Sequence, residues 1–129
     1  MKSLEDFLAL PDVDNIIEEV FVSKRVGKFK VKAMSEDDYA EYTNRARSKI
    51  RKDGVDFDSA KFHILICAGQ TIEPDFANAE FLNKAKCSTA SELIKKKLLP
   101  GEITELANKI CEISGFDTDI NEEIEEAKN

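Results

Sequence analysis

Residues 28–38 read KFKVKAMSEDD, and this stretch decides the fold class because two structural patterns meet within it. Its first six residues alternate between lysine and an apolar residue, which predicts a β-strand with Phe29, Val31 and Ala33 on its inner face. From Ser35 onward the residues are those of a capping box, which begins a helix. The stretch therefore predicts a strand that leads directly into a helix.

A second strand is predicted just before it, over residues 16–25, where Val20 and Val22 share one face and Phe21 takes the other. The two β-rich runs are joined around a glycine, which is typical of a hairpin. We therefore expect a hairpin over residues 16–34. The lysines of its second strand are expected to face solvent on a two-stranded sheet, and they would also protect an edge strand from pairing with another chain.

Helical periodicity and capping residues then continue as far as residue 115, and they predict about five helices after the hairpin. The first expected helix runs from Ser35 through roughly residue 52, and the second from residue 58 or 59 to about 70. A short third helix follows Pro74, and a fourth begins after a cap at Thr89. The fifth runs from Pro100 to a glycine cap at Gly115. A short amphipathic helix capped by Ser3 and stopped by Pro11 precedes the hairpin.

The chain is thus predicted to be α+β and mostly helical, with one globular domain over residues 1–116. Its 129 residues suit a single domain that can bury a hydrophobic core without the help of disulfide bonds or a bound metal ion. Residues 117–129 hold six acidic side chains against one lysine. They are predicted to form an acidic C-terminal tail that is either a short exposed helix or disordered.

The formal net charge is −7, and the acidic residues gather at both ends of the chain. The middle has a small excess of basic residues, and its one local run, residues 45–52, is interpreted as the solvated end of a helix. This distribution argues against nucleic acid as the main partner. The apolar stretch 64–69 is far shorter than the roughly 18 residues of a membrane helix, and acidic residues follow the first methionine, so we expect a cytoplasmic protein without membrane contact.

The cysteines and the histidine give no metal, cofactor or catalytic set. Cys67, Cys87 and Cys111 form no CxxC pair, and His63 is the single histidine. Motifs for phosphate binding, serine hydrolysis and zinc proteolysis do not occur. His63 and Cys67 lie four residues apart in a predicted helix, which leaves a small enzyme with a thiolate–imidazole pair as an alternative. The apolar neighbours of Cys67 favour a reduced core thiol instead, because burial raises a thiol pKa.

Several segments match one known family in order and spacing. They are SLEDFL at residues 3–8, VSKR at 22–25, FKVKAMSE at 29–36, EPDFANAEF at 73–81, ELIKKKLLPGE at 92–102, ISGFD at 113–117 and EAKN at 126–129. Together they resemble the XkdN-like tail assembly chaperones of long-tailed phages and prophages. The departures, KAKC at residues 84–87 in place of a Tyr-Gly type turn and a shorter loop between the two strands, affect turns rather than the core pattern.

The resemblance implies a chaperone and not an enzyme. Such proteins are thought to coat the tape measure protein, a long helical chain that sets tail length, to keep it soluble and to help recruit tail tube subunits in the cytoplasm of the bacterial host. The chaperone then leaves, so the mature virion lacks it. The alternative is a small structural tail or head-completion protein that is retained in the particle. Self-association is left open.

Apolar residues at two places are candidates for binding the partner. The first place is the proline-glycine junction together with the segment after Gly115, and its candidate residues are Leu98, Leu99, Pro100, Gly101, Phe116 and Ile120. The second place is the hairpin with Phe21 and Phe29, which is able to add a strand to a partner. The alternative is that Leu98, Leu99 and Phe116 simply close the core around the last helix.

Overall fold

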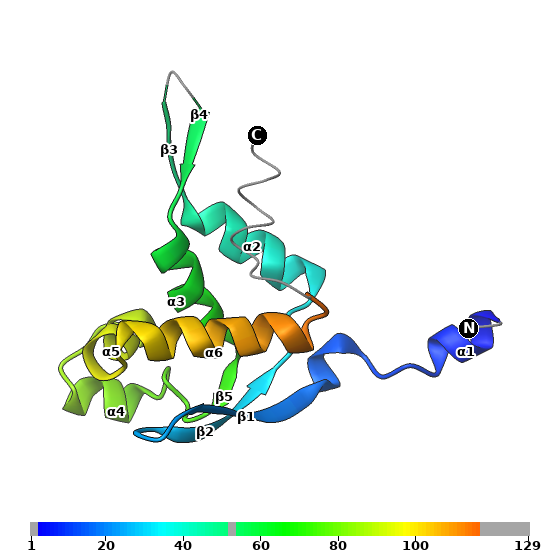
Figure 1. Cartoon of the computed structure of the whole chain (residues 1–129), viewed down its shortest axis with the longest axis horizontal. Coiled ribbons are helices and arrows are strands. Elements are labelled where there is room, and N and C mark those ends of the chain that lie inside the picture. The colour runs from blue at the N-terminus through cyan, green and yellow to red at the C-terminus, as the bar shows by residue number, and fades with distance from the viewer. Residues whose placement is uncertain (1–2, 52–53, 117–129) are drawn as a thin grey trace.

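An antiparallel sheet of three strands forms the base of the molecule (Figure 1). The computed structural model describes residues 3–51 and 54–116. Strands β1 (Ile17–Ser23) and β2 (Gly27–Lys32) form the predicted hairpin. Val20 and Val22 are buried while Phe21 is exposed, which confirms the predicted alternation. The turn uses Gly27 at a φ of +78°, a conformation that favours glycine because it has no Cβ.

The third strand, β5 (Thr71–Glu73), pairs with β2, so β2 is the middle strand of the sheet. The prediction of a two-stranded sheet with a lysine-protected edge is therefore wrong. A strand of three residues directly after a helix is too short to show an alternating pattern in the sequence. One of the lysines, Lys30, instead lies opposite Glu73 across the strands, where opposite charges are favourable.

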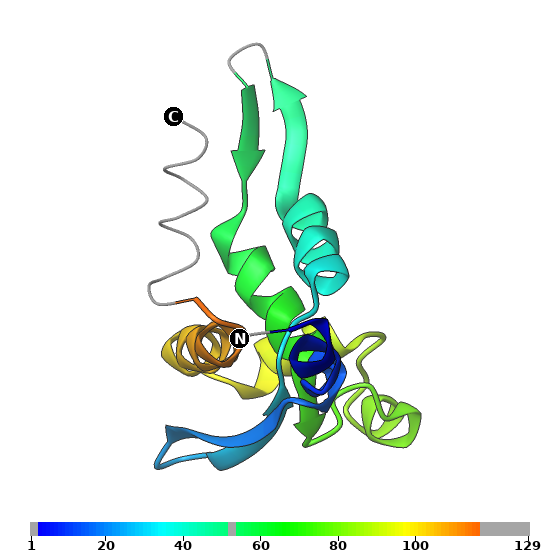
Figure 2. The same cartoon turned by 90° about the vertical axis from the view of Figure 1, so that its right-hand side faces the viewer.

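Helix α2 (Glu36–Ala46) begins with the predicted capping box between Ser35 and Asp38. The prediction that it continues to residue 52 is wrong, because the chain turns into strand β3 (Arg47–Arg51), which pairs with β4 (Gly54–Phe57). Figure 2 shows this second hairpin extending from the ends of α2 and α3, away from the sheet. No proline or glycine marks the end of α2, so the pairing partner rather than a local signal ends the helix.

Helix α3 (Ser59–Gln70) lies at the centre of the structure, against α2, α5 (Ala90–Lys97) and α6 (Pro100–Ile113). Helix α4 (Ala79–Lys84) lies beside α5 at one end of the molecule (Figure 1). In the described part of the chain five α-helices follow the first hairpin, which confirms the predicted α+β class. The largest buried apolar side chains of the core are Phe62, Ile66, Ile94, Leu106, Ile110 and Val31.

The C-terminal end of α6 is closed as predicted, with Gly115 at a φ of +97°. The Phe116 amide donates to the carbonyl of Cys111, 3.1 Å away. The adjacent Ser114 hydroxyl accepts from the Met34 amide at 2.9 Å and donates to the Ile110 carbonyl at 2.7 Å. The end of α6 is thereby joined to the connection between β2 and α2.

A buried amide joins three elements near the centre. Gln70 is 1% exposed, and its Nε2 donates to the carbonyls of Lys32 and Ala33 at 3.3 and 2.9 Å. Its Oε1 accepts from the Tyr42 hydroxyl at 2.6 Å. Burial also raises the pKa of Tyr42 to about 12, so this phenol stays protonated and continues to donate. The end of α3 is thus held to β2 and to α2 at once.

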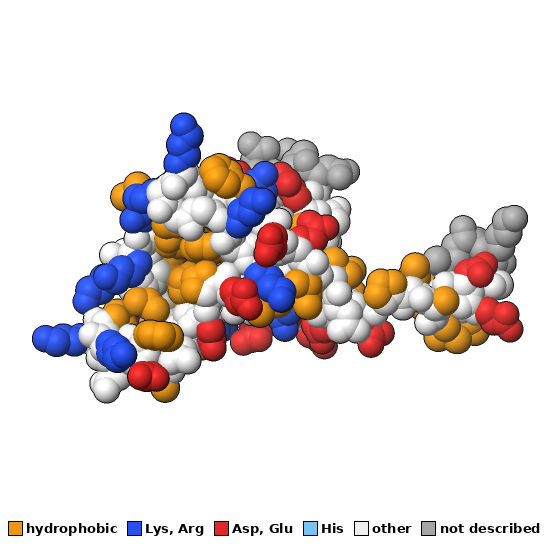
Figure 3. Space-filling view, turned by 90° about the horizontal axis from the view of Figure 1, so that it is seen from below, with side chains coloured by type: hydrophobic (Ala, Val, Ile, Leu, Met, Phe, Trp, Pro, Cys, Tyr) orange, Lys and Arg blue, Asp and Glu red, His pale blue; other side chains and the backbone are white. Residues whose placement is uncertain are grey.

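The N-terminal segment stands away from this body. Helix α1 (Leu4–Leu8) is capped by the Ser3 hydroxyl, which accepts from the Asp6 amide at 3.2 Å, as predicted. A 3₁₀ turn (Val13–Asn15) leads from it to β1. Figure 3 shows the segment projecting from one end of the molecule, with acidic and apolar side chains on it, while lysine and arginine side chains gather at the opposite end of the body.

Gly69→Ala should lower the free energy of unfolding by about 1–3 kcal/mol, the usual cost of overpacking a core. An added Cβ would lie 1.8 Å from the Tyr42 hydroxyl oxygen, so the phenol must move away from Gln70. Urea denaturation followed by circular dichroism measures the change. The matched control is Gly101→Ala, because no atom lies within 4 Å of its added Cβ and alanine favours the helix. Equal stabilities of the two variants would contradict the packing described here.

Candidate partner-binding site

The junction between α5 and α6 directs alternate residues to opposite sides. Leu98 and Leu99 both have extended backbone angles, so their side chains point in different directions. Leu98 is buried, whereas Leu99 is 57% exposed. Pro100 then starts α6 at its first position, where its missing amide hydrogen leaves no bond unmade. At the junction Leu98 therefore packs into the core, whereas Leu99 lies on the surface.

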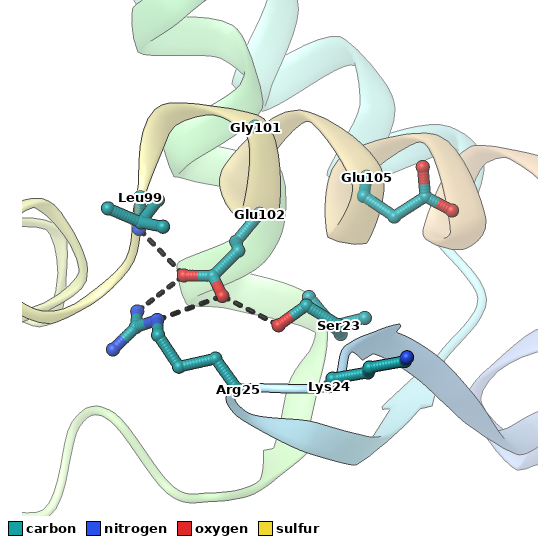
Figure 4. Close-up of a pocket in the computed structure, with 8 residues that line it drawn as sticks. Ser23, Lys24, Arg25, Leu99, Gly101, Glu102 and Glu105 are labelled. Carbon is teal, nitrogen blue, oxygen red and sulfur yellow. Dashed lines mark hydrogen bonds and ion pairs between the residues drawn. The ribbon is translucent and has the colours of Figure 1, made fainter.

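A buried carboxylate holds this junction to the tip of the first hairpin (Figure 4). Glu102, 6% exposed, accepts hydrogen bonds from the Ser23 hydroxyl at 2.6 Å and from Arg25 Nε at 3.1 Å. It also accepts from the Leu99 amide at 2.8 Å and forms an ion pair with Arg25 Nη2. That same guanidinium nitrogen donates to the carbonyl of Lys97 at 2.8 Å, at the end of α5. We call this set of contacts the Glu102 clamp.

Several donors stabilise the charged form of Glu102, so its pKa is lowered to about 2. The hydrogen bonds from Arg25 contribute most, followed by those from Ser23 and from the Leu99 amide. The same hydrogen bond raises the pKa of Arg25 above its ordinary value. Both groups are charged at every pH at which the protein is normally handled, so the clamp is a permanent part of the fold.

An open pocket of about 550 Å³ lies beside the clamp, between α6 and the end of β1. We call it the junction pocket. Its lining residues are Val22, Ser23, Lys24, Arg25, Leu99, Gly101, Glu102 and Glu105. Leu99 gives it exposed apolar surface, while Lys24 and Glu105 place opposite charges at its margin. A pocket of this kind is suited to an apolar side chain of a partner that also carries charged residues.

The other predicted binding residues are divided between the core and the surface. Phe29 is buried, with its ring centroid 5.8 Å from that of Phe76, so it offers no surface to a partner. The alternation of β2 places it on the inner face. Phe116 is half-buried, with its ring centroid 5.4 Å from that of Tyr39. Phe21 is 52% exposed on the face of β1 away from the core.

Of the junction residues, Leu99 and Gly101 line the junction pocket, while Leu98 and Pro100 line a different surface, on the side of α3. Ile120 lies outside the described residues. Sequence reasoning missed Glu102, Arg25 and Ser23 as the residues that hold the site together. The sequence could have indicated Glu102, because it is the third residue of the helix that starts at Pro100. A carboxylate at this position commonly accepts a hydrogen bond from the amide of the residue before the helix, here Leu99.

The histidine and cysteine of α3 do not form an activated pair. Cys67 is fully buried and its Sγ contacts the Ile103 carbonyl oxygen at 3.4 Å. Burial raises the pKa of this thiol, so it remains protonated. Among the described residues, no group of three or more His, Cys, Asp or Glu side chains is arranged to hold a metal ion. None of the described helices is both long enough and apolar enough to span a membrane.

The fold is that of a small α+β domain, and comparison with known proteins gives its class. The family described as phage XkdN-like tail assembly chaperone protein matches residues 4–128. The chain therefore belongs to this family of tail assembly chaperones, which is not a known class of enzymes.

Two relatives from Bacillus subtilis (strain 168) align over 110 residues, or 84% of this chain. The phage-like element PBSX protein XkdN is 28% identical, with 72% of its length covered, and the uncharacterized protein YqbN is 26% identical, with 71% covered. The crystal structure of YqbN has the same fold, with a TM-score of 0.68 at 28% identity over 91% of this chain and 99% of the YqbN chain.

The stability that Glu102 contributes should depend on pH in the acid range. Because the pKa of its carboxyl is lower in the folded protein than in the unfolded chain, this stability is fully present above about pH 4.5 and is lost as the pH falls towards 2. Urea denaturation at several pH values should show Glu102→Gln less stable than the wild type at pH 7, with the difference shrinking between pH 4.5 and 2. The control, Glu105→Gln, removes an exposed carboxylate of the same pocket. A difference for Glu102→Gln that stays constant with pH would contradict the ionised clamp.

Thiol labelling should separate the three cysteines by burial. Cys87 is half-buried, whereas Cys67 and Cys111 are buried in the core. At neutral pH, iodoacetamide should modify Cys87 in the native protein, and all three cysteines in urea, as read by mass spectrometry of peptides. Rapid modification of Cys67 in the native state would contradict the assignment of this residue as a protonated core thiol.

Proposed function

We propose that this chaperone binds the tape measure protein through the junction pocket, keeps it soluble and helps to recruit tail tube subunits during tail assembly. It acts in the cytoplasm of the bacterial host and leaves before the tail matures. Residues 1–116 form its binding domain, and the acidic residues of 117–129 add to the charge that keeps the complex in solution. The observation that carries the proposal is Leu99, a large apolar side chain held exposed by the Glu102 clamp.

The chemistry of the proposed partner explains why such a surface is useful. A long amphipathic helix exposes an apolar stripe along its whole length, and unprotected stripes of this size associate with one another. A chaperone that covers part of the stripe with Leu99 removes this surface from water. The lysine and glutamate at the margin of the junction pocket then pair with the charged residues beside the stripe.

A rigid surface is favoured for this task because binding then costs less conformational entropy. The Glu102 clamp joins the hairpin tip, the end of α5 and the start of α6, so Leu99 is presented in one orientation. Had the junction been a mobile loop, ordering Leu99 on binding would have offset part of the gain from burying it.

The outer face of β1 is the proposed contact for tail tube subunits. Phe21 is 52% exposed and Ile17 is 44% exposed, and both lie on the side of the strand away from the core. In the described sheet β1 is also an edge strand, because only one of its two edges is paired, with β2. The backbone groups of its unpaired edge are able to bond to a strand of another protein. This surface faces away from α6, so both partners can be held at the same time.

Co-expression with the product of the neighbouring long, tape-measure-like gene tests the proposal. The long protein should become soluble and co-purify with the wild-type chain. Leu99→Ser should weaken the complex by about tenfold, since burial of most of a leucine side chain is worth somewhat more than 1 kcal/mol. The matched control is Phe81→Ser on α4, because Phe81 is exposed to the same 57% but lies outside the junction pocket.

Two outcomes would contradict this proposal. If Leu99→Ser and Phe81→Ser co-purify equally with the long protein, the junction pocket is not the binding surface. If the long protein stays insoluble and the chain is instead found in purified mature particles, the protein is a retained structural component of the tail or head.

A further inference from the structure

The unpaired edge of strand β1 has a regular chemistry beyond its exposed apolar residues. In the ladder with β2, the carbonyl of Ile16 accepts from the Ala33 amide at 2.9 Å, so Ile16 directs its carbonyl towards β2. Successive residues of an antiparallel strand direct their backbone groups to opposite edges. The backbone groups of Ile17, Glu19 and Phe21 therefore point to the other edge, where no strand of the described sheet pairs with them.

The same three residues place their side chains on one face of the sheet. Val20 and Val22 alternate with them and are buried against the core. Ile17, Glu19 and Phe21 therefore lie on the outer face, and all three are exposed. A strand added at this edge would place its own side chains beside them, about 5 Å away. The pattern that such a strand meets is apolar, acidic, apolar.

A row of charges crosses the sheet through the middle of this pattern. Glu73 of β5 lies opposite Lys30 of β2, and Lys30 lies opposite Glu19 of β1. The charges alternate in sign from strand to strand, which is the favourable arrangement of cross-strand pairs. Two carboxylates nevertheless share one lysine, so the row reaches the unpaired edge with an excess of negative charge. A lysine or arginine on a fourth strand would continue the alternation and balance the row.

We infer that β1 accepts, as a fourth strand of the sheet, a partner segment with a lysine or arginine between two apolar residues at alternate positions. The cation lies opposite Glu19, and the apolar residues lie opposite Ile17 and Phe21. This inference rests on the proposed function only in taking a tail tube subunit as the source of the segment. The backbone groups and the charge that select the segment belong to this chain.

Pairing of this edge with the same edge of a second copy is disfavoured by charge. The antiparallel alignment that sets Ile17 of one copy opposite Phe21 of the other also sets Glu19 opposite Glu19. Like charges directly opposite each other are destabilising, and the adjacent Glu18 adds to the negative charge. Charged side chains are one means by which proteins prevent pairing between their edge strands. The edge is therefore suited to a basic strand and not to a copy of itself.

The test uses a synthetic cyclic hairpin peptide with one strand that is free to pair. That strand has valine, lysine and valine at alternate positions, with threonine between them, so it reads the same in both directions. The outward amides of the other strand are methylated, which leaves only the designed edge open. A preformed strand is used because it loses little conformational entropy on binding. A second peptide, with glutamate in place of the lysine, is the matched control.

Titration of the isotope-labelled protein, followed by amide NMR spectra, measures the binding and locates it. The lysine peptide should shift the amides of Ile17, Glu19 and Phe21. It should bind about fivefold more tightly than the glutamate peptide, since one peptide gains a favourable charge pair and the other a repulsion. Glu19→Lys should reverse this preference. Glu18→Lys makes the same change in net charge but should keep the preference, because residue 18 lies on the other face of the strand.

Glu19→Pro tests the backbone pairing separately from the charge. Proline removes the amide hydrogen that points to the unpaired edge, and it is tolerated on an edge strand when its nitrogen faces solvent. The control is Glu19→Gln, which loses the same charge but keeps the amide hydrogen. The lysine peptide should bind Glu19→Pro about fivefold more weakly than Glu19→Gln, because one main-chain hydrogen bond is lost.

Two results would overturn the inference. The first is a lysine peptide that shifts no amides along β1 at millimolar concentration, and the second is equal binding of the lysine and glutamate peptides. A failure of the proposed function gives a different result. A tail tube subunit that co-purifies equally with the wild type and with Glu19→Pro does not bind at this edge, even though the lysine peptide does.

Discussion

The apolar character of helix α3 is the constraint on which the rest of the structure depends. Seven of its twelve residues are buried, and they point in all directions around the helix axis: Phe62, His63, Ile64, Leu65, Ile66, Cys67 and Gln70. A helix without a polar face must be covered by protein on nearly all sides. Helix α2 covers one side, α5 and α6 cover the other, and Gln70 ties its end to the sheet. The other elements are arranged as the layer around this helix.

The proposed binding surfaces follow from how that layer is closed. The α5–α6 junction must cross from one side of the layer to the other, and its extended backbone sends Leu98 inward and Leu99 outward. The Glu102 clamp holds the crossing in place through the tip of the first hairpin. As a result the junction contributes to two surfaces, the junction pocket on one side and a hollow beside α3, lined by Leu98 and Pro100, on the other.

The accuracy of the sequence predictions depended on whether the signal was local. The first hairpin, the caps at Ser3, Ser35 and Thr89, and the glycine end of α6 were predicted correctly, because each depends on residues within a few positions of one another. The short strand β5 and the second hairpin were missed, since each forms only where a distant or later segment supplies hydrogen bonds. Leu99 was among the predicted binding residues, but its anchor Arg25–Glu102 joins positions 77 residues apart and has no local pattern.

The sequence by itself determined the fold class, the helix starts, the inner and outer faces of the first hairpin and the likeness to the tail assembly chaperones. These properties depend on hydrophobic period, capping residues and the order of short motifs, all of which are readable along the chain. Only the tertiary structure decided that Leu98 is in the core and Leu99 on the surface, that β2 is the middle strand and that the N-terminal segment, residues 3–15, stands away from the body. The physical reason is that exposure is a property of what packs against a residue, and the packing partners of these residues lie far from them in the sequence.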